Sequence, residues 1–172
     1  MDQQKINKFI GRLMAFHRSD DRASMAKLRQ AAPRLPESVG EVLVVIGDQM
    51  SGLTDGEIVD FSMVATFFAL HPHENGYGNF GTSFRKVFQH EKSGDSIKRR
   101  FEVLCASDRD RLHIHLYNAI SLARARGVKI NWFQLMTDVI EWSAEDRHVQ
   151  YEWMKDFFVP KAPTRKEEDN DG

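Results

Sequence analysis

The sequence has a single cysteine, Cys105, and no long hydrophobic run. One thiol can form neither an internal disulfide nor a thiolate cluster for a metal ion. No apolar run approaches the roughly 18 residues that a membrane-spanning helix needs. The first residues, MDQQKINKF, lack the apolar segment of a signal peptide. We therefore expect a soluble, cytoplasmic protein without a membrane partner, in which Cys105 is a small buried apolar residue.

Motifs for catalysis and cofactor binding are also missing. The chain has no G-x-S-x-G, Walker-type or G-x-G-x-x-G motif, and residues 76–81, GYGNFG, lack the lysine of a phosphate-binding loop. The histidines leave a metal-dependent enzyme as a remote alternative. His113 and His115 lie about 200° apart around a helix axis and cannot hold one ion, while His71 and His73 lack a spaced third ligand. We expect no enzymatic activity, no metal site and no cofactor.

An excess of basic residues is absent too. The chain has 24 basic and 25 acidic residues, for a formal net charge of −1. Autonomous nucleic-acid-binding proteins usually carry a basic excess. Any contact with nucleic acid must therefore come from local clustering of cations, and we do not expect strong binding by the isolated chain.

Apolar residues, in contrast, make up 41% of the sequence and recur with helical spacing. In the first half this spacing predicts helices over residues 1–17, 22–32, 37–50 and 54–70. Residues 42–46, VLVVI, are also β-branched enough for a buried strand. Helical spacing and the lack of a second strand favour a helix there. Thr54 and Glu57 have the spacing of a capping box at the start of the fourth helix.

The second half contains a short predicted helix at residues 80–88 and a long helical region from Asp95 to Phe158. This region divides into three amphipathic helices and a shorter fourth piece. A capping-box spacing predicts that helices begin after Ser107, Asn131 and Ser143. Gly127 is expected to end the longest helix, because glycine adopts a left-handed turn at little cost.

These elements predict an all-α fold of two packed helical sub-bundles, with about eight or nine helices in a single compact unit. We expect the N-terminal sub-bundle to span residues 1–75 and the C-terminal one to span 76–158, with the divide in the loop-like segment 71–79. Residues 159–172 have mixed charge and no apolar period, which predicts a disordered tail.

Basic residues on the outward faces of the helices are the strongest functional signal. Ile97, Phe101 and Leu104 occupy the apolar face of one helix, so Arg99 must project outward with Lys98 and Arg100 on its flanks. Arginine suits phosphate oxygens, and helix starts add affinity for anions. Further basic residues lie on nearby helices or just beyond their ends: Arg85, Lys86, Arg109, Arg111, Arg124, Arg126 and, just beyond, Lys129.

Two alternatives remain at this point. Charges on amphipathic helices commonly form only a solvated face, which leaves open a helical protein–protein adaptor without direct nucleic-acid contact. Tyr77, Phe80 and Phe84 have the flat rings that stack on bases, but aromatics at helical spacing more commonly belong to the core.

The order of short motifs along the chain resembles the CasB family, the small subunit of the type I-E CRISPR surveillance complex called Cascade. Residues 96–158 are similar to the C-terminal half of that family. The matching motifs are RRF-x-x-L at 99–104, the long helix ending at Gly127, V-x-I-x-W at 128–132, D-x-x-x-W at 138–142 and W-x-x-x-F at 153–157. Two further landmarks lie upstream, FALHP at 68–72 and NFGTSFRKV at 79–87.

The resemblance implies a non-catalytic subunit of an antiviral complex. Such subunits lie as a head-to-tail pair and pack against the backbone and large subunits. They stabilise the hybrid of guide RNA and target DNA and hold the displaced DNA strand of the R-loop. Contacts to a nucleic-acid backbone are independent of sequence and screened by salt, which suits a cationic face.

Carried over by position, the resemblance places the family's basic contacts on four helices. Together with Arg111, the candidate nucleic-acid-binding residues are Lys27, Arg29, Arg85, Lys86, Lys98, Arg99, Arg100 and Arg109. One position departs from the family pattern: Thr82 stands where an arginine is usual, and Arg85 follows one helical turn later.

Overall fold

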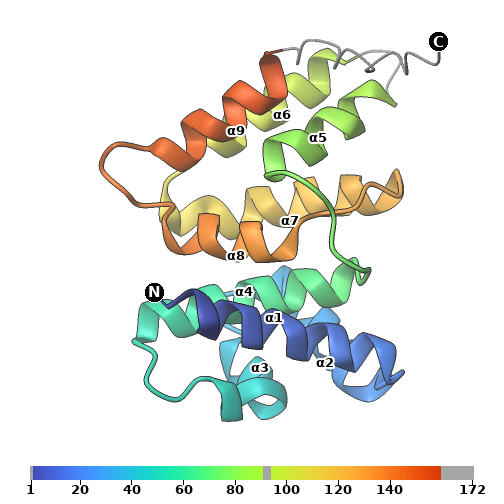
Figure 1. Ribbon diagram of the computed structural model, residues 1–172, viewed down its shortest axis with the longest axis vertical. Coiled ribbons are helices and arrows are strands. Elements are labelled where there is room, and N and C mark those ends of the chain that lie inside the picture. The colour runs from blue at the N-terminus through green and yellow to red at the C-terminus, as the bar shows by residue number, and fades with distance from the viewer. Residues whose placement is uncertain (1, 91–93, 160–172) are drawn as a thin grey trace, which may run out of the picture.

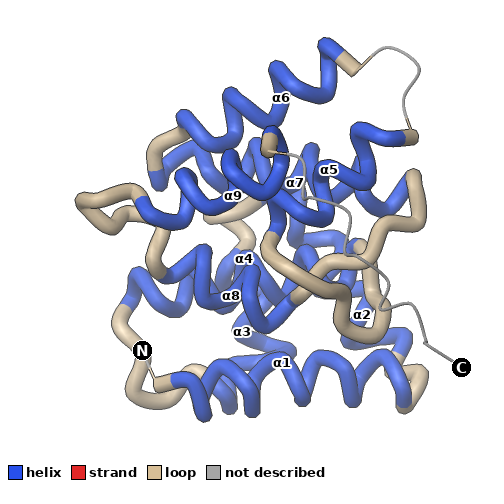
Figure 2. Tube along the Cα trace, turned by 45° about the horizontal axis from the view of Figure 1, so that its top comes forward, coloured by secondary structure: helices blue, strands red, loops and turns tan. Residues whose placement is uncertain are grey.

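The computed structural model describes residues 2–90 and 94–159. Within these residues the chain forms nine α-helices, two short 3-10 helices and no strand, which confirms the predicted all-α fold (Figures 1 and 2). The α-helices are α1 (Gln3–Arg18), α2 (Arg22–Ala31), α3 (Val39–Ile46), α4 (Asp55–Leu70), α5 (Phe80–Gln89), α6 (Asp95–Ala106), α7 (Arg109–Ala125), α8 (Trp132–Ile140) and α9 (His148–Phe158). The predicted tail lies outside the described residues, apart from Val159.

The helices are arranged in successive levels along the longest axis of the molecule (Figure 1). One end contains α1 to α4, the middle contains α7 and α8, and the other end contains α5, α6 and α9. Within the described residues, no helix combines the length and apolar character needed to cross a membrane.

The helix α4 occupies the interior of the fold. Every residue from Asp60 to Leu70 is buried, because α4 packs against α2 and α3 on one side and α7 and α8 on the other. One core therefore continues from the N-terminal helices into the C-terminal ones. The placement of a sub-bundle boundary at residues 71–79 stays a prediction.

The ambiguous segment at residues 37–50 is helical. It forms α3 and the 3-10 helix η2 (Gly47–Gln49). Val42 and Ile46 are buried while Val44 is 77% exposed, so the apolar residues follow the period of a helix and not that of a strand.

Three of the predicted helix termini are confirmed. The Thr54 hydroxyl accepts a hydrogen bond from the Glu57 N–H at 3.3 Å, and the Glu57 carboxylate accepts one from the Thr54 N–H at 2.8 Å. Asn131 caps α8 by accepting from the Gln134 N–H at 3.1 Å. Gly127 follows α7 with a φ of 64°.

Two predicted caps are wrong. The Ser107 hydroxyl donates to the Leu104 carbonyl at 2.7 Å, so it closes α6 and does not begin α7. Ser143 lies in a turn, and α9 starts only at His148, after Arg147 with a φ of 50°. The Ser107 hydroxyl bonds to a backbone group of the preceding turn, which the spacing alone cannot distinguish from a cap.

The loop between α4 and α5 is pinned to the segment before α8. The Gly76 N–H donates to the Ile130 carbonyl at 2.8 Å, and the Ile130 N–H donates to His73 Nε2 at 3.2 Å. His71 Nε2 lies 2.8 Å from the Val128 carbonyl oxygen. A Cβ atom at Gly76 would lie 2.8 Å from backbone carbon atoms of Lys129 and Ile130, so only glycine allows this approach. His71 and His73 thus hold the loop against the backbone of the segment before α8.

This arrangement predicts a pH dependence of stability. Burial lowers the pKa of His73 from 6.5 to about 4. Between these pH values the unfolded chain binds more protons than the folded chain. The contribution of His73 to the free energy of unfolding is therefore complete above about pH 6.5 and is lost as the pH falls toward 4.

Urea denaturation at pH 7 and pH 5 tests this prediction. The change in the free energy of unfolding between the two pH values should be smaller in His73→Gln than in the parent chain, and His90→Gln, at an exposed histidine, is the matched control. If the change in the free energy of unfolding between pH 7 and pH 5 were the same in His73→Gln as in the parent chain, the neutral imidazole of His73 would not stabilise the loop contact.

Candidate nucleic-acid interface

The orientation of α6 determines which of its basic residues reach solvent. Its buried residues are Ile97, Phe101, Leu104 and Cys105. Arg99 and Arg100 are exposed on the other side, as the spacing predicts. Lys98 is half-buried, with its ammonium nitrogen 5.1 Å from the centroid of the Phe88 ring.

Cys105 behaves as the sequence predicts. Its side chain is 4% exposed, and burial raises the pKa of its thiol to about 12. At neutral pH it is therefore a protonated, apolar core residue and not a nucleophile.

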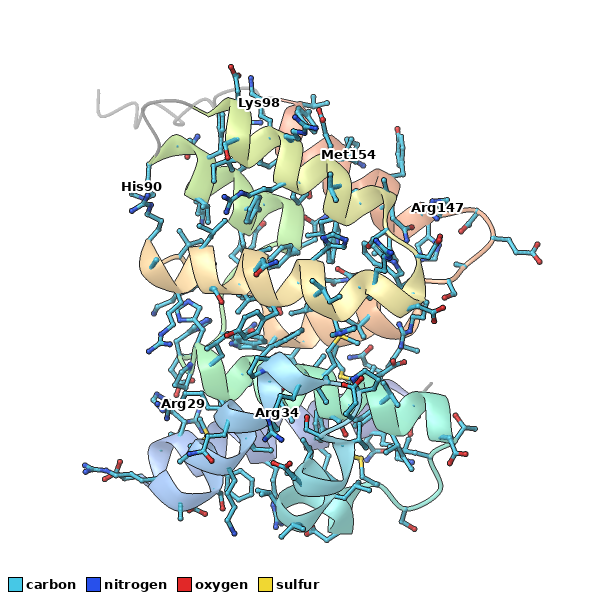
Figure 3. The ribbon with its side chains drawn as sticks, turned by 180° about the vertical axis from the view of Figure 1, so that it is seen from behind. Arg29, Arg34, His90, Lys98, Arg147 and Met154 are labelled. Carbon is cyan, nitrogen blue, oxygen red and sulfur yellow. The ribbon has the colours of Figure 1, made fainter. Side chains whose placement is uncertain are left out.

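A groove of about 500 Å³ separates the outward faces of α6 and α7. We call it the α6/α7 groove. The two helices that form it face the viewer in Figure 3. From α6 it is lined by Ser96, Arg99, Arg100 and Val103, and from α7 by His115, Asn118, Ala119 and Leu122.

The groove is cationic. Its lining includes no acidic residue, and within the described part of the chain neither Arg99 nor Arg100 forms an ion pair or hydrogen bond. Arg111 lies one helical turn before His115 and adds to the positive charge. The pKa of His115 is lowered, first by burial and then by repulsion from Arg111 and His113. His115 is therefore neutral at pH 7, next to arginines that remain charged.

Arg109 faces inward, unlike Arg99 and Arg100. Its guanidinium forms an ion pair with Asp60 of α4 and donates to the Val139 carbonyl of α8. The Asp60 side chain is only 7% exposed. A buried carboxylate requires a partner, so Arg109 serves the packing of three helices and does not join the candidate interface.

Arg85 also has a role inside the fold. It donates from Nη1 to the Phe157 carbonyl at 3.0 Å and so ties α5 to the end of α9. The next residue, Lys86, is exposed. The Thr82 hydroxyl lies 3.3 Å from an oxygen of Asp156.

The nine predicted cations do not form one continuous ridge. Lys27 and Arg29 are exposed on α2, and Figure 3 shows Arg29 at the N-terminal end of the molecule, far from Lys98 at the opposite end. Of these cations, Arg99 and Arg100 line the α6/α7 groove, and Arg111 acts on His115 of the same groove.

Sequence reasoning missed His115 and Asn118 as parts of this site. Together with Arg111 they occupy positions i, i+4 and i+7 of α7, which share one helix face. That polar stripe is the signal that could have identified them.

A second groove, between α8 and α9, is acidic, whereas the α6/α7 groove is cationic. Its lining includes Asp138, Glu141 and Glu152. Asp138 is 5% exposed and accepts hydrogen bonds from Trp153 Nε1 at 2.7 Å and Gln134 Nε2 at 2.8 Å. Burial raises the pKa of Asp138 to about 6.

In residues 2–90 and 94–159, no group of three or more potential ligands has a geometry that could hold a metal ion.

Comparison with known proteins assigns the chain a family. Residues 24–158 match the family model described as CRISPR-associated protein Cse2. The chain is 27% identical over 96 residues to a CRISPR-associated protein Cse2 of Thermus thermophilus, a match that covers 56% of this chain and about half, 54%, of that relative.

Solved structures share the fold. A crystal structure of a Cse2-family protein from Thermus thermophilus has a TM-score of 0.77 at 20% identity, covering 92% of this chain and 99% of the other. A chain in a structure of a CRISPR RNA-guided surveillance complex has a TM-score of 0.74 at 25% identity, covering 90% and 92%.

The inward placement of Arg109 makes a prediction about stability. Asp60→Ala or Arg109→Ala leaves one charge of the pair unpartnered, and each should lower the free energy of unfolding by about 3 kcal/mol. The double variant Asp60→Leu/Arg109→Met should lose less than the sum of the single variants. Urea denaturation measures all three. If Arg109→Ala matched the stability of the parent chain, Arg109 would be a surface residue after all.

Proposed function

The chain belongs to the CRISPR-associated Cse2 family, also called CasB, and from this we propose that it is the non-catalytic small subunit of a type I-E Cascade antiviral complex. The similarity to a chain of a CRISPR RNA-guided surveillance complex, at 25% identity over 92% of that chain, supports this proposal. The proposed partners are the backbone and large subunits, and a second copy of the chain head to tail.

Within such a complex, we propose that the subunit contacts the phosphate backbone of guide RNA, target DNA and displaced strand. The observation that supports these phosphate contacts is that Arg99 and Arg100 project from α6 without ion-pair or hydrogen-bond partners among the described residues. Arginine forks bind phosphate oxygens in any sequence context. The groove between α6 and α7, with Arg111 at its side, is the centre of the proposed interface, and the exposed Lys27, Arg29 and Lys86 are additional contacts.

The net charge of −1 suits a subunit that shares the binding of nucleic acid with neighbouring subunits. Backbone contacts alone give weak binding when few phosphates are neutralised. Neighbouring subunits would hold the nucleic acid, and this subunit would add a small number of contacts to strands already in place.

A non-catalytic role also suits the groove. Its lining contains one histidine and no carboxylate, so it lacks the pair of groups that general acid–base catalysis commonly uses. Three carboxylates, those of Asp138, Glu141 and Glu152, line the groove between α8 and α9 instead, and Asp138 there is already hydrogen-bonded to Trp153 and Gln134.

The second candidate is a protein–protein adaptor without nucleic-acid contact. Exposed apolar side chains favour it, since Val44 is 77% and Tyr151 is 65% exposed. Assembly that does not depend on salt, with no crosslink from this subunit to RNA or DNA, would support the adaptor.

Replacing Lys98, Arg99 and Arg100 by alanine tests the proposed interface. In the assembled complex, this variant should bind target DNA about tenfold more weakly, and the slope of log affinity against log salt should become shallower by about 0.7–0.9 for each lost phosphate contact. Target binding at several salt concentrations is the measurement.

A matched control removes the same charge elsewhere. Arg12, Arg22 and Arg34 are exposed and each is paired with a carboxylate, so their triple alanine variant should retain target binding. Equal losses in both triple variants would mean that net charge, and not the α6 surface, controls binding.

A further inference from the structure

The α6/α7 groove contains more than a cationic surface. We propose that it receives one unstacked nucleotide of a single strand, with the phosphate at Arg99 and Arg100 and the base inside the groove. The inference rests on the proposed function and adds to its backbone contacts a contact with the base of one nucleotide.

The lining of the groove combines cationic and apolar side chains. Arg99 and Arg100 supply positive charge on α6, while Val103, Ala119 and Leu122 supply apolar surface from both helices. A phosphate group would contact only the two arginines. A ligand that presents phosphates alone would therefore leave the apolar side chains of the groove uncovered. A nucleotide uses both, because each base has an apolar face.

Polar groups on α7 can meet the edge of a base. The Asn118 side chain is exposed and carries both a donor and an acceptor. The lowered pKa of His115 keeps its imidazole neutral at pH 7, so it too offers one donor and one acceptor. Bases present the same mixture of donors and acceptors along their edges, and guanidinium planes such as that of Arg100 can stack on them.

The size of the groove favours a single nucleotide. Its volume of about 500 Å³ lies in the range of small-ligand pockets, roughly 300–1,000 Å³. In a duplex the bases are paired and stacked, so a duplex can present only its backbone to this surface. An unstacked base can enter, which favours single strands over duplexes at this site.

The absence of carboxylates from the lining favours nucleic acid over a basic peptide. An oligoglutamate would satisfy Arg99 and Arg100 but has no ring to cover Val103, Ala119 and Leu122. The contribution of the base therefore distinguishes a nucleotide from any other polyanion.

Binding of two strands to the full-length chain tests the inference. The first is an oligothymidine of about ten nucleotides, and the second has the same phosphates but abasic sugars. At low salt, NMR titration should show the oligothymidine binding at least about fivefold more tightly, since stacking of one base contributes roughly 1–3 kcal/mol. The resonances of Asn118 and His115 should shift only with the base-containing strand.

Three variants test which residues produce the difference in affinity between the oligothymidine and the abasic strand. Val103→Ser, at a side chain that is 44% exposed, should remove most of the difference between the strands while leaving the abasic strand bound. Arg99→Ala/Arg100→Ala should weaken both strands. Val44→Ser, at an exposed valine on α3, is the matched control and should retain the full difference.

The outcomes separate the two proposals. Equal affinity for both strands, or an unchanged difference in Val103→Ser, overturns the nucleotide site and leaves backbone binding intact. An oligoglutamate that binds as tightly as oligothymidine also overturns it. Absence of binding to either strand overturns the nucleotide site, whereas the proposed function, in which neighbouring subunits hold the nucleic acid, is tested separately by target binding of the assembled complex.

Discussion

Burial of the apolar face of α6 is the constraint on which the candidate interface depends. Phe101 lies at the centre of this face, with its ring centroid 4.3 Å from that of Phe157 and 5.3 Å from that of Phe84. A rotation of α6 by one residue, about 100°, would move Phe101 out of the core and turn a charged side chain toward it. Burying an unpaired charge costs several kcal/mol. Arg99 and Arg100 therefore face outward because α5 and α9 hold the other side of the helix.

The arginines predicted to contact nucleic acid on α5, α6 and α7 differ in whether the fold supplies them with a partner. Arg109 and Arg85 satisfy buried or half-buried acceptors, Asp60 and the Phe157 carbonyl. Arg99 and Arg100 have no such partner in the described part of the chain. In a chain with almost no net charge, this division leaves Arg99 and Arg100 to give the α6/α7 groove its positive charge. The proposed small subunit of Cascade needs no more than this, because the other subunits would hold most of the nucleic acid.

The sequence predicts those features that depend on local periodicity. The outward orientation of Arg99 follows from Ile97, Phe101 and Leu104, and the Thr54 cap follows from its spacing to Glu57. The roles of Arg109 and Ser107 could not be predicted in this way. Whether Arg109 reaches solvent depends on Asp60, a residue distant in sequence that α4 brings beneath it. An acidic residue within the buried run of α4 was a usable signal, but it does not identify its partner. The groove itself exists only because α7 lies beside α6 in space.

Chemical modification of arginines, followed by mass spectrometry, tests the central claim most directly. A reagent specific for guanidinium groups should modify Arg99 and Arg100 rapidly in the free chain and Arg109 slowly. In a complex with bound target DNA, Arg99 and Arg100 should become protected. The account would be contradicted if Arg109 reacted as fast as Arg99, or if Arg99 and Arg100 stayed fully reactive with the target bound.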